Sequence, residues 1–191
     1  MTKLSITSGE FRGQKIFAPD TSAVHPMGAR EKLALFNALE SLIGPLSTDL
    51  NVLDCYCGSG ALGLEALSRG AGRAIFVDQN PTAIATVKQN IATLGVGNRA
   101  HVKKEDFSVF VRENSEKSPF FQFFDVIFVD PPYDNFPQNL GQIASLLKND
   151  GILALSHPTS VDPTELLPNF QLIKTKKHAA ANLSFLVKHE H

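Results

Sequence analysis

"NVLDCYCGSGALGLEALSRG", residues 51–70, is the stretch from which the fold of this chain can be predicted. It opens with an apolar run that ends in Asp54, which is typical of a buried strand. Three glycines follow in G-x-G-x-x-G spacing: Gly58, Gly60 and Gly63. The remainder has a helical pattern and ends at Gly70, a residue type that commonly terminates helices. A strand, a glycine-rich turn and a helix in this order predict the first half of a βαβ unit.

The same alternation continues along the chain. We expect strands at residues 51–56, 73–78, 100–106, 123–130 and 151–157, separated by helices at 60–70, 81–95, 106–114 and 135–149. This order predicts a parallel sheet with helices on both faces and right-handed crossovers. Two further strands, 170–178 and 183–189, should close the sheet as an antiparallel pair. The expected fold class is therefore α/β, Rossmann-like, with a mostly parallel seven-stranded sheet.

The N-terminal part differs from this pattern. Residues 3–9 and 13–19 resemble a small hairpin whose turn contains Gly9 and Gly13. Residues 27–44 then form an expected amphipathic helix, whose apolar face is Leu33, Phe36, Leu39, Leu42 and Ile43. We therefore divide the chain into an N-terminal extension, residues 1–45, and an α/β domain, residues 46–191.

Composition limits the class of protein. The chain has 191 residues, 43% of them hydrophobic, and a formal net charge of -1, which is not a general nucleic-acid-binding composition. The charge is uneven, however: residues 1–32 carry five basic and three acidic side chains, and residues 170–191 carry four basic and one acidic. A polyanionic partner would have to bind at such local patches.

The cysteines and the N-terminus point to a soluble intracellular protein. Cys55 and Cys57 are too close for an unstrained disulfide and too few for a structural zinc site, so we expect reduced, packed thiols and no metal. The N-terminus lacks an apolar signal-peptide core, and no run reaches membrane-spanning length.

Acidic residues end three successive expected strands: Asp54, Asp78 and Asp106. Ligands of open α/β sheets bind at the carboxyl ends of the strands, although each acid could alternatively be a helix N-cap. An acid in the mouth of the glycine loop would repel a pyrophosphate but suits a cationic ligand such as S-adenosylmethionine, which has a sulfonium and an ammonium and no phosphate. We expect the cofactor contacts to be Asp54, Gly58, Gly60, Asp78, Gln79, Asp106 and Phe107.

The fourth expected strand ends in "FDVIFVDPPYDNF", residues 124–136. Two prolines stiffen the turn and remove two backbone donors, so the groups left to face the cleft are acceptors: the Asp130 carboxylate and the Pro131 carbonyl. Tyr133 adds a flat face for stacking. Such a site suits a planar group that bears an amine. Its acceptors could direct the lone pair of the amine nitrogen at an electrophilic methyl group. Asp130, Pro131 and Tyr133 are therefore the candidate catalytic residues.

These motifs resemble class I S-adenosylmethionine-dependent methyltransferases, and the D-P-P-Y form resembles the branch that methylates amino nitrogens. The segments "SGEFRGQKI", "LFNAL", "CGSGALGLEALSRGA", "FVDQN" and "FDVIFVDPPY", in this order, resemble the RsmD family of 16S ribosomal RNA guanine-N2 methyltransferases. The resemblance implies a bacterial cytoplasmic enzyme that modifies a guanine in small-subunit RNA. We expect a monomer, although the sequence leaves the oligomeric state open. The basic residues Arg12, Lys15 and Arg30 would then hold RNA phosphates.

The chain departs from the family pattern in "VHPMGAREKLALFN", residues 24–37. The departures are His25 for Arg, Met27 for Thr, Ala29 for Asp and Leu33 for Glu, whereas Pro26, Arg30, Phe36 and Asn37 fit. This segment would lie near the cofactor and the RNA entrance.

Three other functions are compatible with parts of the sequence. A DNA adenine-N6 methyltransferase would share the D-P-P-Y chemistry, but only about 45 residues precede the core, which is short for a DNA-recognition domain. A protein glutamine-N5 methyltransferase usually has Asn where this chain has Asp130. A non-catalytic RNA-binding assembly factor could retain the fold without the activity.

Overall fold

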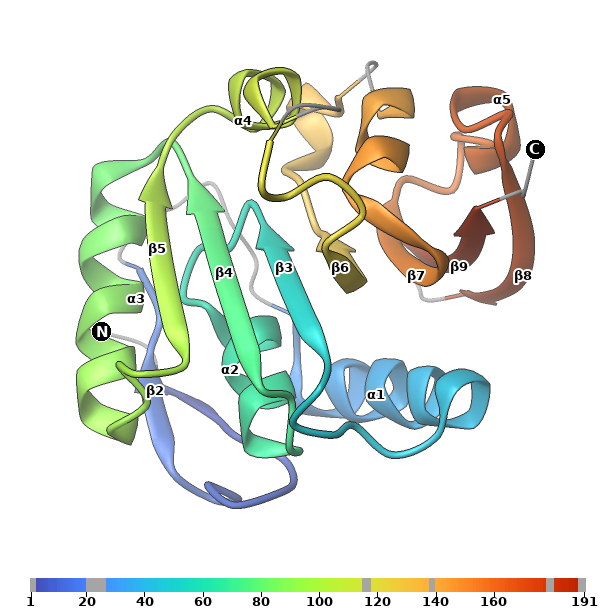
Figure 1. Cartoon of the computed structure of the whole chain (residues 1–191). Helices are drawn as coiled ribbons and strands as arrows, with labels where there is room; N and C mark the ends of the chain where they lie inside the picture. Colours follow the sequence, from blue (N-terminus) through green and yellow to red (C-terminus); the bar gives the residue numbers. More distant parts are fainter. Residues whose placement is uncertain (1–2, 20–26, 115–117, 138–139, 178–180, 189–191) are drawn as a thin grey trace.

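The computed structural model describes residues 3–19, 27–114, 118–137, 140–177 and 181–188. Seven strands form one sheet in the order β5-β4-β3-β6-β7-β9-β8 (Figure 1). They are β3 (Asn51–Cys55), β4 (Arg73–Asp78), β5 (Ala100–Lys104), β6 (Phe124–Val129), β7 (Leu147–His157), β8 (Phe170–Lys177) and β9 (Asn182–Lys188). Five strands of this sheet, β3 to β7, run parallel, and β9 pairs antiparallel with both β7 and β8. The predicted mostly parallel seven-stranded sheet is confirmed.

Helices cover both faces of the sheet. α1 (Ala29–Ile43), α2 (Ala61–Ser68) and α3 (Pro81–Leu94) pack on one face, and α4 (Phe107–Glu113), the 3₁₀ turn η2 (Gly141–Ser145) and α5 (Pro163–Leu166) lie over the other. Because side chains alternate along a strand, adjacent residues of β3 enter different cores: Val52 packs with α1, and Leu53 packs with α4 and η2. Burial on both faces explains why these strands are almost wholly apolar.

Local sequence accounts for the ends of α3. The Asn80 side chain accepts hydrogen bonds from the backbone N–H of Thr82 (2.8 Å) and of Ala83 (3.4 Å), and Pro81 occupies the first turn. At the other end, Gly95 adopts the left-handed conformation (φ 69°) that glycine enters without a steric penalty. These caps place α3 where the sequence predicts it.

The predicted helix at 135–149 is wrong for the residues that the structure describes there. Two short 3₁₀ turns, η1 (Tyr133–Asn135) and η2, replace it, and β7 already begins at Leu147. Pro137 and Gly141 both disfavour a continuous α-helix. In addition, Leu140, Ile143 and Leu146 are buried at a spacing of three residues, which matches the period of a 3₁₀ helix.

The N-terminal hairpin, β1 (Lys3–Ser5) with β2 (Lys15–Phe17), forms as predicted and lies against α2 and α3. Its turn approaches the end of α2 so closely that a Cβ at Gly9 would lie 1.8 Å from the Ser68 carbonyl oxygen. The Asn90 side chain of α3 accepts a hydrogen bond from the Phe17 backbone N–H (2.8 Å) and donates one to the Phe17 carbonyl (2.9 Å). The hairpin is therefore held at both ends.

The apolar face predicted for α1 is wrong at one position. Phe36 and Leu39 are buried and Leu42 and Ile43 partly so, as expected, but Leu33 is 41% exposed. The helix is turned so that Lys32, which is only 2% exposed, faces inward, and the residue after it points outward. A charged residue thus occupies a core position of this helix.

A buried acid, Glu65 of α2, explains this orientation. Its carboxylate forms ion pairs with Lys32 (3.1 Å) and Arg69 (3.1 Å) and accepts hydrogen bonds from the backbone N–H groups of Thr7 (2.8 Å) and Ser8 (2.9 Å). Burial alone would raise the pKa of Glu65, but the Thr7 hydrogen bonds and the Lys32 charge lower it below its ordinary value. The hairpin, α1 and α2 therefore share one buried polar cluster, and the division at residue 45 stays a prediction.

Candidate cofactor and target site

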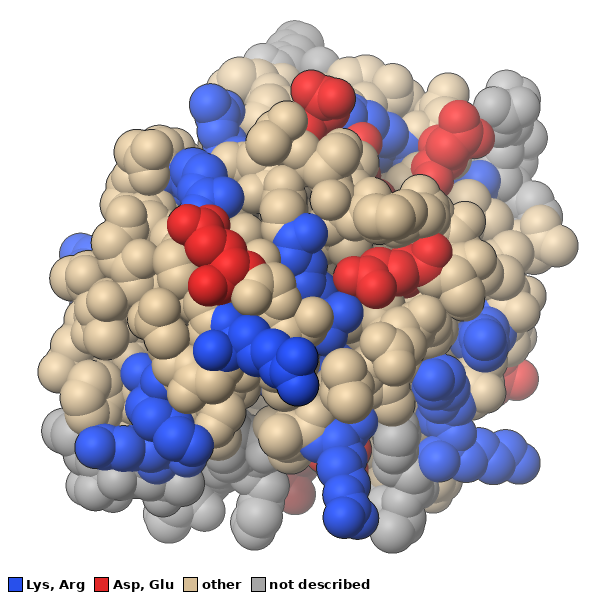
Figure 2. All heavy atoms as spheres, turned by 90° about the horizontal axis from the view of Figure 1, so that it is seen from below, with Lys and Arg blue, Asp and Glu red and all other residues tan. Residues whose placement is uncertain are grey.

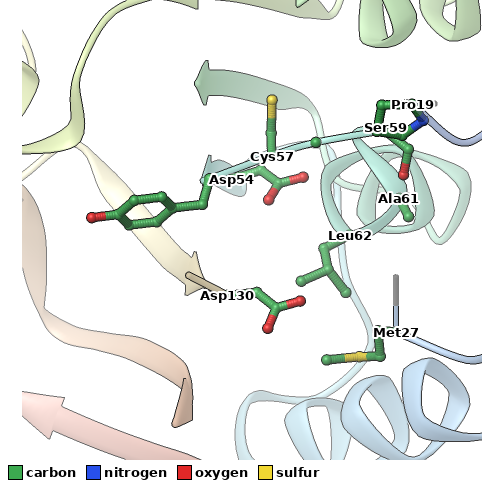
Figure 3. Close-up of a pocket in the computed structure, with 10 residues that line it drawn as sticks. Pro19, Met27, Asp54, Cys57, Ser59, Ala61, Leu62 and Asp130 are labelled. Atoms are coloured by element: carbon green, nitrogen blue, oxygen red, sulfur yellow. The ribbon is translucent and has the colours of Figure 1, made fainter. Parts of the chain in front are cut away.

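A pocket opens at the carboxyl ends of β3 and β6 (Figure 3). Its lining residues are Pro19, Met27, Asp54, Tyr56, Cys57, Gly58, Ser59, Ala61, Leu62 and Asp130. The carboxylates of Asp54 and Asp130 point toward the space that Leu62 and Met27 bound on the other side. Among the described residues that line the pocket, two are acidic and none is Lys or Arg. The pocket therefore has an excess of negative charge.

Asp54 is buried at the end of β3, where the sequence predicts it. Its Oδ2 accepts a hydrogen bond from the Gly63 backbone N–H (2.9 Å) at the start of α2. A Cβ at residue 63 would lie 2.4 Å from the Phe76 ring and 3.2 Å from Asp54 Oδ2, so this approach requires glycine. Burial raises the pKa of Asp54 well above its ordinary value, and the nearby Asp130 and Asp78 carboxylates raise it further. A cation in the pocket would relieve this repulsion.

Asp78, at the end of β4, holds the glycine loop. Its Oδ2 accepts from the Gly58 backbone N–H (3.0 Å), and its Oδ1 accepts from the Asn80 backbone N–H (2.8 Å). Gly58 itself has a left-handed backbone (φ 53°), and a Cβ there would meet only the Tyr56 carbonyl oxygen, at 3.9 Å. The loop therefore leaves open space beside Gly58. Gln79 is exposed directly after Asp78.

Asp106 and Phe107 have structural roles that the sequence also allowed. The Asp106 carboxylate caps α4, because it accepts hydrogen bonds from the Ser108 backbone N–H (2.9 Å) and hydroxyl, and these bonds lower its pKa. Phe107 is buried, and its ring centroid lies 5.1 Å from that of Tyr56. Neither is among the residues that line the pocket, and their cofactor contacts stay a prediction.

Tyr56 is a pocket residue that the sequence analysis missed. It follows β3 directly and has a left-handed backbone (φ 57°), which is uncommon for any residue other than glycine. Burial raises the pKa of its hydroxyl, so the ring stays neutral. Its position just after a strand end, in a chain with only two tyrosines, was the signal that could have identified it.

The D-P-P-Y segment lies beside the pocket at the end of β6. Pro131 is buried and Tyr133 is 39% exposed, with its hydroxyl 2.6 Å from the Ser156 hydroxyl of β7. Burial raises the pKa of Asp130, whereas the nearby Ser156 hydroxyl stabilises its charge and limits this rise. Ser156 thus links the acid to the aromatic ring of the motif. No local pattern in the sequence identifies Ser156 as part of the site.

The two cysteines are packing residues. Cys55 and Cys57 are both buried and free, and they enter different hydrophobic cores on the two sides of the sheet. Burial raises the pKa of each thiol well above its ordinary value, so neither is a thiolate at neutral pH. This confirms the predicted packing role and argues against a cysteine nucleophile.

Comparison with known proteins agrees with this geometry. A family model described as "Conserved hypothetical protein 95" matches residues 4–187. The Escherichia coli protein named Ribosomal RNA small subunit methyltransferase D is 34% identical over 152 residues, which cover 80% of this chain and 70% of that protein. The chain belongs to the RsmD family. YlbH from Bacillus subtilis is another relative, 32% identical over 180 residues, which cover 91% of this chain and 92% of YlbH.

Solved structures share the fold of this RsmD-family chain. The Escherichia coli structure yhhF superposes with a TM-score of 0.81 at 26% identity, and all of both chains is covered. A T. thermophilus 16S rRNA N2 methyltransferase, RsmC, superposes with a TM-score of 0.69 at 21% identity, over 98% of this chain and 50% of that one. The methyltransferase-like α/β architecture is therefore confirmed.

The RsmD-family chain differs from the family pattern directly at the pocket. Met27, which stands where the family usually has Thr, lines the pocket, and Leu33, which stands in place of Glu, is exposed on α1. Glu31, on the same helix, lies near enough to Asp130 to raise the pKa of that carboxyl. His25 and Pro26 lie outside the described residues.

The structure places the three basic residues that were predicted to hold RNA on three different elements. Arg12 lies in the hairpin turn, whose Glu10 and Phe11 contact Ser68 at the end of α2 farthest from the pocket (Figure 1). The Lys15 ammonium donates a hydrogen bond to the Ser5 hydroxyl (2.7 Å). Arg30 is exposed in the first turn of α1, on the pocket side. The three residues therefore belong to a hairpin turn, a strand and a helix.

The face seen from below in Figure 2 carries both signs of charge, with Asp and Glu side chains between many of the Lys and Arg side chains.

Within the described part of the chain, no three His, Cys, Asp or Glu side chains gather in a way that could hold a metal ion. In the same part, no helix is both long and apolar enough to cross a bilayer.

Proposed function

We propose that this protein transfers a methyl group from S-adenosylmethionine to the exocyclic N2 amine of a guanine in 16S ribosomal RNA of the small subunit. The observation that carries this proposal is an acidic pocket, with Asp54 and Asp130 facing one space and no basic side chain in its described lining, directly beside D-P-P-Y. An excess of negative charge favours a cationic cofactor over a dinucleotide, whose pyrophosphate it would repel.

The pocket residues fit S-adenosylmethionine in the chemistry of their donors and acceptors. Asp54 would face the positive end of the cofactor, and the open side of Gly58 would leave room for it. Asp78 already uses each carboxylate oxygen once for a backbone N–H, and each oxygen has a second lone pair that could accept from a ribose hydroxyl. When bound, S-adenosylmethionine supplies an electrophilic methyl group.

Asp130 and Tyr133 would hold the target base. A carboxylate that accepts a hydrogen bond from the amine draws the nitrogen lone pair out of conjugation and turns it toward the cofactor. Because burial raises the pKa of Asp130, this residue is a stronger proton acceptor than an ordinary aspartate. The exposed ring of Tyr133, held by Ser156, offers a face on which a base that has left its helix could stack.

The names of the relatives support an RNA substrate. The Escherichia coli relative is named for the small ribosomal subunit RNA, and the T. thermophilus enzyme with the same fold was solved with AdoMet and guanosine. A DNA adenine-N6 enzyme would use the same motif. It is less well supported, because the N-terminal segment packs against α2 and α3 and does not form a separate recognition domain.

The decisive experiment is transfer of a labelled methyl group from S-adenosylmethionine to bare 16S RNA and to small ribosomal subunits, followed by mapping of the label to a nucleotide and an atom. We expect N2-methylguanine as the product. A label on adenine N6, or on protein, would refute the proposed target. Tight binding of NAD without binding of S-adenosylmethionine, in a thermal-shift comparison, would refute the cofactor assignment.

A further inference from the structure

Basic side chains flank the D-P-P-Y site on the side of β8, the last strand of the sheet. Ser156 of β7 pairs with Leu183 of β9, and Leu183 pairs with Lys176 of β8. Residues paired across adjacent strands share a face of the sheet, so Ser156 and Lys176 lie in one row on one face. Two strand spacings of about 4.8 Å separate them, which places the Lys176 backbone roughly 10 Å from that of Ser156.

The same face brings α1 to this row. The Lys176 ammonium donates a hydrogen bond to the carbonyl oxygen of Ala34 (2.9 Å), and Arg30 lies one helical turn before Ala34. Lys174 is two residues before Lys176 on β8, so its side chain lies on the same side of the strand. A contact between residues 142 positions apart in sequence therefore brings the basic side chains of α1 and β8 to one face of the sheet beside the target site, with Lys174 in the row of Ala154, two residues before the row of Ser156.

These cations are available to a ligand. Arg30 and Lys174 are exposed, and within the described residues neither has an acidic partner within ion-pair distance. Glu31, the acid next to Arg30 on α1, accepts a hydrogen bond from the Gly28 backbone N–H (3.0 Å) and acts electrostatically on Asp130 and Tyr133 of the target site.

The hairpin turn offers a poorer surface. It lies where α2 ends (Figure 1), whereas the pocket is lined by Ala61 and Leu62 at the start of that helix. Its acidic residue Glu10 pairs with Arg99 (3.2 Å), so the turn presents an acid as well as Arg12. Lys32, which contributes to the positive charge of this segment in sequence, is buried against Glu65 and cannot reach a ligand.

We propose that Arg30, Lys174 and Lys176 form a phosphate-binding surface that holds the RNA strand carrying the target base. The proposal rests on the proposed function, because it assigns the RNA backbone to one flank of that same site. Contacts to phosphates position a strand without reading its sequence, and they release counterions, so their loss weakens binding and flattens its salt dependence.

Two double variants with matched charge loss test this placement. Arg30→Ala with Lys174→Ala removes two exposed cations beside the target site, and Arg12→Ala with Lys15→Ala removes two from the hairpin. Lys176 is left intact, because it also holds α1 through Ala34. The probe is unmodified 16S RNA made by transcription, and its dissociation constant is measured over a series of salt concentrations, together with the affinity of each variant for S-adenosylmethionine.

For the Arg30/Lys174 double variant, we expect the plot of log affinity against log salt concentration to become less steep. The magnitude of its slope should fall by about 0.7–0.9 for each lost phosphate contact. Its affinity for S-adenosylmethionine and its melting temperature should stay at wild-type values, and the hairpin double variant should keep the wild-type slope. An unchanged slope in the Arg30/Lys174 variant, or equal losses in both variants, would overturn the placement. This binding assay needs no catalysis, so a failure of methyl transfer in the wild type would refute the proposed function separately.

Discussion

The hydroxyl oxygens of Tyr133 and Ser156 lie 2.6 Å apart, which connects the aromatic residue of the D-P-P-Y segment to the neighbouring strand β7. Ser156 is buried on the same face as the pocket, and it also stabilises the charge of Asp130. This contact restrains the Tyr133 ring, so a serine outside the motif orients the surface on which the target base is proposed to stack. Ser156 is therefore a positioning residue in the proposed reaction.

Removing both hydroxyls should cost no more than removing the Ser156 hydroxyl alone, because Ser156 also stabilises the charge of Asp130. Tyr133→Phe and Ser156→Ala each delete one side of a hydrogen bond worth about 0.5–1.5 kcal/mol, and the double variant should lose no more than the larger single loss. The measurement is kcat/KM for methyl transfer to RNA, with urea unfolding as a control for stability. Tyr133→Ala should lose roughly 1–3 kcal/mol more through base stacking. Additive losses in the double variant would show that the two hydroxyls act independently.

Asp130→Ala should abolish most methyl transfer while S-adenosylmethionine still binds. The carboxylate is proposed to accept a hydrogen bond from the target amine, and this contact strengthens as the nitrogen lone pair leaves conjugation, so the loss should fall mainly on kcat. Asp130→Asn retains an acceptor oxygen and should keep part of the activity. Single-turnover rates and cofactor affinity check both variants. Full activity in Asp130→Ala would exclude the proposed mechanism, and equal, complete loss in both would indicate that the charge itself is required.

Cofactor affinity should fall on acidification. Burial raises the pKa of Asp54, so this carboxylate takes up a proton at a higher pH than an ordinary aspartate and then no longer attracts a cation. Calorimetric titration with S-adenosylmethionine from about pH 8 to about pH 5 should show a loss of at most about tenfold per pH unit for this group. The Asp54→Asn variant should bind S-adenosylmethionine weakly at every pH, and its affinity should no longer show the pH dependence that Asp54 causes.

The stability of the ligand-free protein should change in the opposite sense. A carboxyl whose pKa is higher in the folded than in the unfolded state binds protons on folding, so its contribution to stability rises as the pH falls between the two pKa values. The difference in melting temperature between Asp54→Asn and the wild type should therefore be larger at neutral pH and smaller on acidification. A difference that is independent of pH would contradict the assignment of this titration to Asp54.

The two acids that contact Arg69 should differ in their contribution to stability. Glu65 is 0% exposed and Glu40 is 32% exposed, although each lies 3.1 Å from an Arg69 nitrogen. Glu65→Gln leaves Lys32 buried without its counter-charge and should cost about 3–5 kcal/mol, whereas Glu40→Gln should cost about 0–1 kcal/mol. Urea unfolding of the two variants measures this difference. Similar losses would mean that burial does not control the strength of these pairs.

The Glu65 contribution should also depend on pH. Its pKa is lowered in the folded protein, so the stabilisation is fully present above the ordinary carboxyl pKa and is lost as the pH falls through the lowered value. The stability difference between the wild type and Glu65→Gln should therefore shrink in acid. An increase in that difference on acidification would contradict the sign of the shift.

The amino-acid sequence by itself determined the features that depend on neighbours along the chain. Apolar runs that end in Asp54, Asp78 and Asp130 predicted three strands and the edge at which they meet, because strand formation and turn residues are local properties. Asn80, Pro81 and Gly95 predicted the ends of α3 for the same reason. The resemblance in these segments was also sufficient to predict the family.

Tertiary structure decided the features that depend on which strands and helices become neighbours. Ser156 meets Tyr133 only because β6 and β7 pair in parallel with Val129 opposite Leu155, a register that no local pattern encodes. The inward rotation of Lys32, which leaves Leu33 exposed, follows from the buried carboxylate of Glu65 on another helix. Hydrogen bonds and ion pairs of this kind join residues that are 23 or more positions apart, and such contacts form only when the chain has packed.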